Sequence, residues 1–146
     1  MDNTADKLKL IPIVSTVGTY YCDTAMYLAS YLMPLTDNQY NLRNPLDFSD
    51  CLSHATLAED EMLVSYDVSS LFTQVPLEET IDHIIHKIYT ETKLPKLGSK
   101  MLFKRLLLKV TKGTVFSFNN RLYKQVNGCG MGNPLSPVLA NISCPN

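Results

Sequence analysis

The sequence predicts an α+β fold within one domain. Several segments repeat apolar residues at the 3.6-residue spacing of amphipathic helices, and two short runs that flank Asn119-Asn120 are typical of a β-hairpin. These elements do not follow the regular alternation of strand and helix that a doubly wound sheet requires. The chain has 146 residues, of which 45% are hydrophobic and 18% charged, so it can bury one modest core and is not of the disordered class.

The first half of the chain contains two predicted helices and one predicted strand. Asp23 or Thr24 caps the first helix, which ends near Pro34. The apolar face of this helix consists of Ala25, Leu28, Ala29 and Leu32. A polar loop over 37–45 leads to a second helix over 46–57. The short apolar run over 62–66 then predicts a buried strand that stops at Asp67.

The second half contains three predicted helices and the hairpin. Pro76 suits the first turn of a helix whose apolar stripe is Ile81, Ile84, Ile85 and Ile88. Ser99 caps the next helix, in which Leu102, Phe103, Leu106, Leu107 and Val110 are expected to face inward. The hairpin joins 114–118 to 121–125, because asparagine tolerates the positive φ of a tight turn. A glycine-rich loop over 127–132 and a last helix over 134–142 complete the domain.

Charge divides the chain into two unequal parts. All 14 acidic residues lie between Asp2 and Glu91, together with only four basic ones, which gives a formal charge of −10. The remaining nine basic residues follow Thr92 without any acid, a charge of +9. Two explanations stay open: a polyanionic partner bound on the basic side, or two solvated faces that attract each other within the fold. Five cations share one broad face of the helix that follows Ser99: Lys100, Lys104, Arg105, Lys109 and Lys112.

The same composition bears on cellular location and on metal binding. The N-terminus is acidic where a signal peptide is basic, and no apolar run approaches the roughly 20 residues of a membrane span, so we expect an intracellular protein, in the nucleus or the cytoplasm, that is not secreted. The four scattered cysteines are then expected to be reduced. His83 and His86 have no Cys or third His spaced to join them, which favours a solvated helix face over a metal site.

Two segments could carry chemistry. Asp67 ends the predicted buried strand and precedes a small polar turn, which is a rigid mount for a metal-binding carboxylate, although aspartate also caps turns in many proteins without any catalytic role. The glycine-rich segment over 128–142 lets the backbone approach a ligand closely. It is not a phosphate-binding loop of the Gly-Lys-Ser/Thr type, and it lacks the Gly-x-Gly-x-x-Gly dinucleotide spacing.

In this order and at this separation, the two segments resemble the reverse transcriptases of Penelope-like retroelements. Residues 63–77, with Tyr66-Asp67-Val68 and Leu71-Phe72-Thr73, look like that family's motif A, and residues 128–142, with Met131-Gly132-x-Pro134-Leu135-Ser136-Pro137, look like its motif B. The likeness extends over about 8–142 and includes the hairpin before motif B and the segment Pro12-Ile13-Val14-Ser15. It implies a single partial reverse-transcriptase domain over 1–146: a partial polymerase palm with part of the fingers, in which short antiparallel sheet elements pack with helices.

The resemblance also implies roles for individual residues. Asp67 would ligate both Mg²⁺ ions, and the carbonyl of Val68 would help to hold one of them. The backbone of Ser69, Ser70 and Leu71 would lie along the incoming deoxynucleoside triphosphate. Phe72 would be the steric gate that excludes a 2′-hydroxyl, and Met131 and Gly132 would line the nucleotide pocket. The implied partners are an RNA template, a DNA primer and deoxynucleoside triphosphates, with no membrane and no stable protein partner.

We expect Lys124 and the five cations that follow Ser99 to contact the phosphate backbone of the template or primer. This expectation comes from their charge and not from the family resemblance. The sequence departs from the family at Ile11, Gly130 and Asn133, and, more seriously, it has no Asp-Asp pair and no acid after Glu91. One carboxylate cannot complete the nearly octahedral shells of two Mg²⁺ ions, so we expect this chain to be inactive by itself. A nucleic-acid-binding remnant without catalysis and a translated remnant without function are the alternatives.

Overall fold

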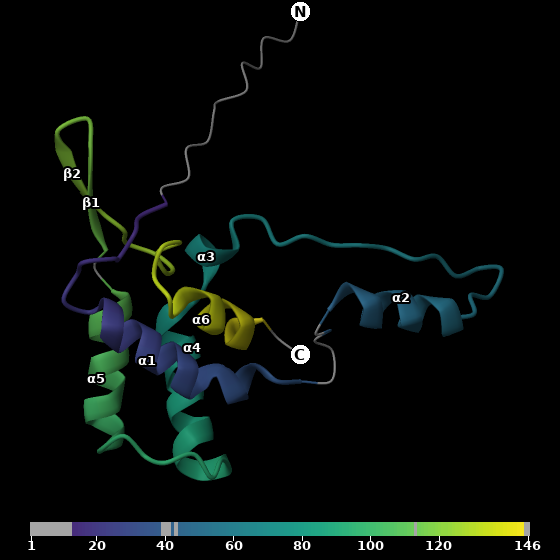
Figure 1. Ribbon diagram of the computed structural model, residues 1–146, viewed down its shortest axis with the longest axis horizontal. Coiled ribbons are helices and arrows are strands. Elements are labelled where there is room, and N and C mark those ends of the chain that lie inside the picture. The colour runs from purple at the N-terminus through teal and green to yellow at the C-terminus, as the bar shows by residue number, and fades with distance from the viewer. Residues whose placement is uncertain (1–12, 39–41, 43, 113, 145–146) are drawn as a thin grey trace, which may run out of the picture.

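The computed structural model describes residues 13–38, 42, 44–112 and 114–144. Figure 1 shows a helical body from which a β-hairpin and a long arm extend. The longer helices are α1 (Cys22–Leu32), α2 (Pro45–His54), α4 (Leu77–His86), α5 (Lys100–Thr111) and α6 (Ser136–Ser143). Shorter turns are the 3-10 turn η1 (Met33–Thr36), α3 (Leu71–Gln74) and the π-turn η2 (Lys87–Glu91), and the only described sheet pairs β1 (Val115–Phe118) with β2 (Arg121–Lys124). The α+β class is therefore confirmed.

The core lies where α5 packs against α4 and α1 and where α6 packs against α4 (Figure 1). The predicted apolar faces of α1 and of the helix after Pro76, which continues from α4 into η2 with Ile88, are confirmed, since all eight named residues are buried: Ala25, Leu28, Ala29, Leu32, Ile81, Ile84, Ile85 and Ile88. The helix α5 buries Phe103, Leu107 and Val110, which are spaced by four and three residues. Leu102 and Leu106 were expected to face inward but are 60% and 38% exposed, because they lie on the flank of that narrow stripe.

Helix ends follow local side-chain chemistry at two places and not at a third. Ser99 caps α5 as predicted, with its Oγ accepting a hydrogen bond from the Leu102 N–H at 3.3 Å. Asn44 caps α2 by accepting from the N–H groups of Leu46 and Asp47. The expectation that Asp23 or Thr24 caps the first helix is wrong, since α1 begins at Cys22 after Tyr21 and has no side-chain cap.

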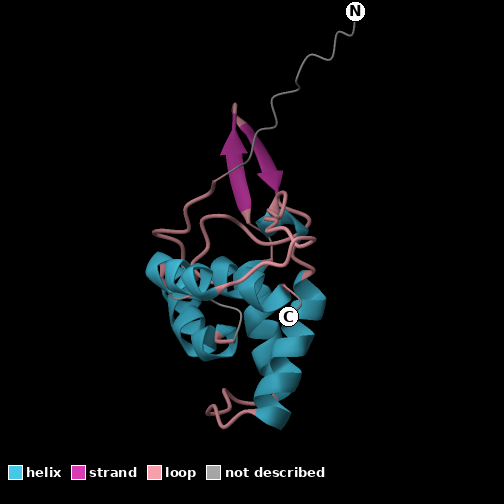
Figure 2. Cartoon of the chain, turned by 90° about the vertical axis from the view of Figure 1, so that its right-hand side faces the viewer, coloured by secondary structure: helices cyan, strands magenta, loops and turns pink. Residues whose placement is uncertain are grey.

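The hairpin has the predicted turn. Asn119 and Asn120 adopt φ of 49° and 57°, the left-handed pair that joins two strands with the natural twist of a sheet. The strands pair antiparallel, with Val115 opposite Lys124 and Phe118 opposite Arg121. Figure 2 shows that the hairpin projects beyond the helices.

The predicted buried strand over 62–66 is wrong. These residues are extended but exposed, with Leu63 at 66% and Tyr66 at 92% exposure, and they form no ladder with another strand in the described part of the chain. A strand is buried only when neighbouring backbone and side chains cover it. In the described part of the chain this run pairs with neither strand of the hairpin and packs against neither apolar cluster, so it stays exposed.

The arm over 44–69 contains α2 and this extended run, and all of its residues are exposed except Asp47, which is half-buried. A helix is present where one was predicted over 46–57, but it ends at His54 and buries no residue. Across the described residues, no helix is both long and apolar enough to cross a membrane.

Candidate active site

The glycine loop over 127–133 lies directly against the turn that contains Phe72. The Cys129 N–H donates to the Phe72 carbonyl at 2.9 Å. Gly128 has a φ of +67°, and a Cβ at this position would lie 2.2 Å from the Phe72 oxygen and 2.6 Å from the Thr73 Cα. Only glycine therefore allows this approach. The two segments singled out in the sequence, 63–77 and 128–142, meet at this contact.

A second glycine brings a third segment to the same loop. A Cβ on Gly132 would lie 1.8 Å from the Val14 carbonyl oxygen, so the two backbones are in direct contact. The hydroxyl of Thr16, which is 2% exposed, donates to the Gly132 carbonyl at 3.1 Å. The segment around Val14 and Ser15, which is part of the family likeness, is thus held against the glycine loop. Ile11 and Pro12 lie outside the described residues.

Buried hydrogen bonds fix the loop on the helices. The Asn133 side chain donates from Nδ2 to the Val110 carbonyl at 2.8 Å and accepts the Leu135 N–H on its Oδ1 at 2.9 Å. Ser136 Oγ donates to the Gly130 carbonyl at 2.7 Å. Among the described residues, every buried side-chain nitrogen or oxygen has a partner. The loop is therefore held at a fixed position at the C-terminal end of α5.

A small apolar cluster lies under the contact between the two motifs. Val75, Cys129 and Ala140 are buried in it, and Leu71 and Phe72 pack half-buried against them. Burial raises the pKa of the Cys129 thiol, although its hydrogen bonds partly oppose this effect. The thiol is therefore a packing group that also points at the Phe72 carbonyl, 3.6 Å from its Sγ. Met131 and Gly132, which were predicted to line the nucleotide pocket, follow Cys129 closely in the chain and are half-buried.

The turn between Asp67 and α3 is strained at one residue. Ser70 has a φ of 56° and a ψ of 40°, the left-handed region that a non-glycine residue adopts at a cost of about 1 kcal/mol. Its carbonyl accepts hydrogen bonds from the Thr73 N–H and the Thr73 hydroxyl, at 3.0 and 2.9 Å. Ser69 lies exposed in the same turn. The turn reverses the chain so that Phe72 points back to the glycine loop.

The residues present do not by themselves fit a pair of metal ions. Asp67 is exposed at the end of the extended run, and Val68 beside it is 54% exposed. Within the described residues, no group of three or more His, Cys, Asp and Glu side chains could hold a metal ion. One carboxylate and one carbonyl leave most of the coordination positions of two Mg²⁺ ions unfilled.

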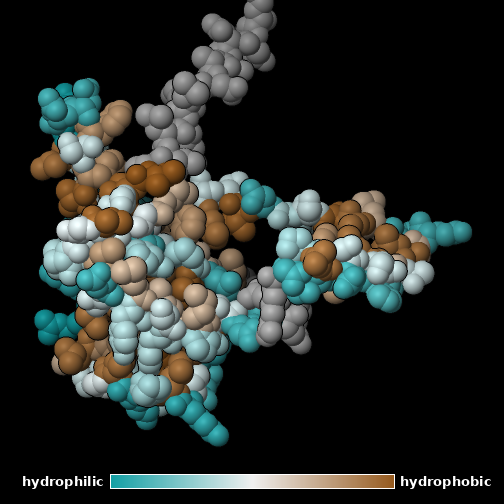
Figure 3. Space-filling view, in the orientation of Figure 1, coloured by the Kyte–Doolittle hydropathy of each residue, from teal (hydrophilic) through white to brown (hydrophobic). Residues whose placement is uncertain are grey.

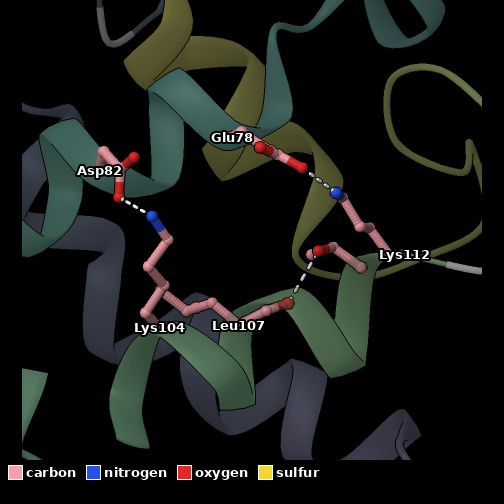
Figure 4. Close-up of polar contacts among 6 residues, drawn as sticks. Glu78, Asp82, Lys104, Leu107 and Lys112 are labelled. Carbon is pink, nitrogen blue, oxygen red and sulfur yellow. Dashed lines mark hydrogen bonds and ion pairs between the residues drawn. The ribbon is translucent and has the colours of Figure 1, made fainter. Parts of the chain in front are cut away.

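The predicted basic face of α5 is partly neutralised within the fold. Lys104 forms an ion pair with Asp82, and Lys112 forms one with Glu78, both across to α4 (Figure 4). The ammonium of Lys100 lies 5.8 Å from the centre of the Tyr89 ring. Arg105 and Lys109 are exposed on the same helix, and Lys124 is exposed at the end of β2. Attraction between the two charged halves therefore accounts for two of the five helix cations.

A family model described as reverse transcriptase (RNA-dependent DNA polymerase) matches residues 13–144. This chain belongs to the reverse transcriptase family. The match includes all the segments that meet at the glycine loop. Membership implies a nucleic-acid template, nucleotide substrates and divalent metal ions in the family's reaction. No curated protein and no solved structure gives a significant match.

Sequence reasoning did not identify several residues that hold this site together. Thr16 and the buried thiol of Cys129 connect segments that are far apart in the chain, and Gln125 ties the end of the hairpin to the glycine loop that follows it. Their hydrogen-bond partners are set by the tertiary fold, which no local pattern reveals. Asn133 offered one signal, because an asparagine between a glycine loop and a proline-rich helix start often accepts a hydrogen bond from the backbone two residues on.

Proposed function

We propose that this chain is a single partial reverse-transcriptase domain of a Penelope-like retroelement, which carries motif A over 63–77 and motif B over 128–142. The observation that supports it best is the contact between Phe72 and the Gly128-Cys129 backbone. Two segments with the residues of motifs A and B, separated by more than fifty residues in the chain, meet at the residue that would select the sugar. The parent enzyme would be an intracellular RNA-directed DNA polymerase that extends a DNA primer on an RNA template.

In the proposed enzyme, Phe72 discriminates between sugars by shape. The ring packs half-buried against Val75, Cys129 and Ala140, which restricts its movement. In this position beside motif B, the ring would collide with the 2′-hydroxyl of a ribonucleotide but would leave room for the sugar of a deoxynucleotide. Met131 and Gly132, at the end of the same rigid loop, would line the base side of the pocket. The backbone of Ser69, Ser70 and Leu71 would lie along the triphosphate.

Catalysis needs more carboxylates than the described residues bring together in one place. Asp67 would supply one ligand for Mg²⁺, and the Val68 carbonyl another, while the metal ions supply charge stabilisation in nucleotidyl transfer. Because the sequence has no Asp-Asp pair and no acid after Glu91, the proposal is that the remaining ligands come from a Tyr-x-Asp-Asp segment of the parent protein. This chain alone would then be inactive.

The source transcript tests this origin directly. We would translate it in all frames beyond the codon for Asn146. A Tyr-x-Asp-Asp segment in the same frame, or after one shift of frame, is the expected result. A following region that carries only stop codons and no such segment would leave the catalytic roles as properties of an ancestor, and the parent polymerase proposed here would be wrong.

A second candidate function is nucleic-acid binding without catalysis. It is favoured by the exposed Arg105, Lys109 and Lys124, for which no ion pair is found within the described residues, in a stretch that has no acid after Glu91. It predicts salt-dependent binding that survives Asp67→Ala, because phosphate contacts do not require the catalytic carboxylate. Undetectable binding at low ionic strength would eliminate this candidate.

A further inference from the structure

One face of the hairpin carries three aromatic rings and an arginine. Residues opposite each other in an antiparallel pair point to the same side, as do residues two apart in one strand. Phe116 is opposite Tyr123, and Phe118 is opposite Arg121. These four side chains therefore share one face, while Val115, Ser117, Leu122 and Lys124 share the other.

The aromatic face is not used to cover the core. Phe116 and Tyr123 stack on each other with ring centres 5.6 Å apart and planes 17° apart, and neither packs against the core clusters. Phe118 is 57% exposed and Tyr123 is 42% exposed. Figure 3 shows hydrophobic residues along the hairpin below its hydrophilic tip. Exposed rings in a row on a projecting hairpin are a platform for a flat ligand.

The surrounding charge favours a polyanion. Residues 92–146 contain no acid, and the hairpin itself contributes Arg121 and Lys124, both exposed. Neither takes part in an ion pair within the residues that the structure describes, in contrast to Lys104 and Lys112 on α5. Aromatic rings interleaved with unpaired cations are the combination that binds single-stranded nucleic acids.

The base of the hairpin is fixed to the candidate active site. The Gln125 N–H donates to the Thr114 carbonyl, which extends the strand pairing by one step. The Gln125 side chain donates from Nε2 to the carbonyls of Asn127 and Cys129, each at 2.9 Å. Cys129 in turn bonds to Phe72. The platform is therefore attached through two hydrogen bonds to the residue that would select the nucleotide.

We propose that the face of Phe116, Phe118, Arg121 and Tyr123 binds a single-stranded segment of nucleic acid by stacking its bases. This inference rests on the proposed function, which makes nucleic acid the expected ligand, and it locates the binding surface on the hairpin. A single strand fits better than a duplex because its bases expose their faces, whereas the bases of a duplex are already stacked on one another. In the parent enzyme this segment is unpaired template or primer next to the nucleotide site.

A binding measurement with matched variants tests the proposal. The probe is fluorescein-labelled oligo(dT), whose anisotropy is followed at low ionic strength with the full 146-residue chain. Phe118→Leu keeps an apolar side chain of similar exposure but removes the ring, so the affinity should fall about tenfold, which is the loss of about one stacked base. Leu122→Ala, on the opposite face and 79% exposed, is the control and should leave the affinity within about twofold.

A second variant separates stacking from charge. Arg121→Gln should reduce the slope of log affinity against log salt by about one, while Phe118→Leu should leave that slope unchanged. Equal losses in Phe118→Leu and Leu122→Ala would overturn the proposal, since binding would then not depend on the aromatic face. Circular dichroism of each variant verifies that the fold is retained.

Two other results would also overturn it. A dimer detected by light scattering that Phe118→Leu dissociates, with oligonucleotide affinity unchanged, would make the face an interface between copies. Absence of binding at low salt would reject the platform but not the polymerase origin, which depends on the transcript beyond Asn146. Retained binding with Asp67→Ala is expected, because Asp67 is not on the hairpin.

Discussion

At the scale of single residues, the candidate site depends on two glycines that have no side chain to keep backbones apart. Gly128 meets the backbone of Phe72 and Thr73, and Gly132 meets the backbone of Val14. In both places the neighbouring atoms belong to main chain, which cannot move aside as a flexible side chain can. The geometry of the candidate site is therefore sensitive to the addition of one methyl group.

Gly128→Ala is expected to destabilise the fold by about 2 kcal/mol or more, because it adds both left-handed strain and a collision with the Phe72 carbonyl. Gly18→Ala is the matched control, since Gly18 has a φ of +80° but no atom within 4 Å of an added Cβ. It should cost only about 1 kcal/mol. Urea unfolding measures both free energies. Equal losses would mean that the contact between the two motifs does not form.

Phe72→Ala tests sugar selection in an intact polymerase that contains these residues. Removing the ring should reduce the preference for deoxynucleotides over ribonucleotides by about tenfold or more, because the collision with the 2′-hydroxyl disappears. The comparison of kcat/KM for the two nucleotides measures it. Leu71 packs in the same cluster, so Leu71→Ala is the control. It should lower stability without changing the preference for deoxynucleotides. An unchanged preference in Phe72→Ala would remove the steric-gate assignment.

At the scale of elements, α4 and α5 are joined by apolar packing inside and by ion pairs outside. Lys112 donates a hydrogen bond to Glu78 and, with its charge, lowers the pKa of that carboxyl below its usual value. Because the pKa is lower in the folded than in the unfolded chain, the pair stabilises the fold above the ordinary glutamate pKa. This contribution is lost as the pH falls through the lowered pKa. Both side chains are largely exposed, so the effect is small.

Glu78→Gln should therefore weaken the acid dependence of stability between neutral pH and about pH 3, the range in which carboxylates titrate. Glu79→Gln, the neighbouring acid with no ion pair in the described part of the chain, is the control. Denaturation midpoints across this pH range measure the difference. An identical pH dependence in Glu78→Gln and the unchanged chain would show that the pair does not exist in solution.

Substitutions in the core helices should cost far more stability than substitutions in α2. Ile84 in α4 is fully buried, so Ile84→Ala should destabilise by about 2–5 kcal/mol. Phe48 in α2 is 47% exposed on a helix without buried residues, so Phe48→Ala should change stability by about 0.5 kcal/mol or less. Both free energies come from urea titrations. A large loss in Phe48→Ala would indicate that α2 packs against the body.

At the scale of the whole molecule, local patterns predicted most elements and few of their contacts. The stripes of α1 and α4, the Ser99 cap and the Asn119-Asn120 turn were predictable because each depends on neighbouring residues. The exposure of the run before Asp67 was not predictable, because an apolar run becomes a buried strand only where other elements lie beside it. The meeting of motifs A and B could be inferred only from family resemblance, since Phe72 and Cys129 are joined by backbone atoms that any residue carries.

The charge division also becomes clear only at this scale. Two of the basic residues of α5 neutralise α4, whereas those of the hairpin remain exposed without an ion pair in the described structure. Attraction between charged faces thus explains Lys104 and Lys112 at the helices, whereas a polyanionic partner is the explanation that we propose for the cations of the hairpin. This division makes the hairpin, rather than the helix face as a whole, the place to look for nucleic acid.

Primer extension tests the central claim most directly. The 146-residue chain and the longer translation product of its transcript are each given an RNA template, a DNA primer and deoxynucleotides with Mg²⁺ or Mn²⁺. The account predicts no extension by the chain alone, and extension by the longer product that Asp67→Ala abolishes. Extension by the 146-residue chain that depends on Asp67 would contradict it, because these residues would then complete the metal site without further carboxylates.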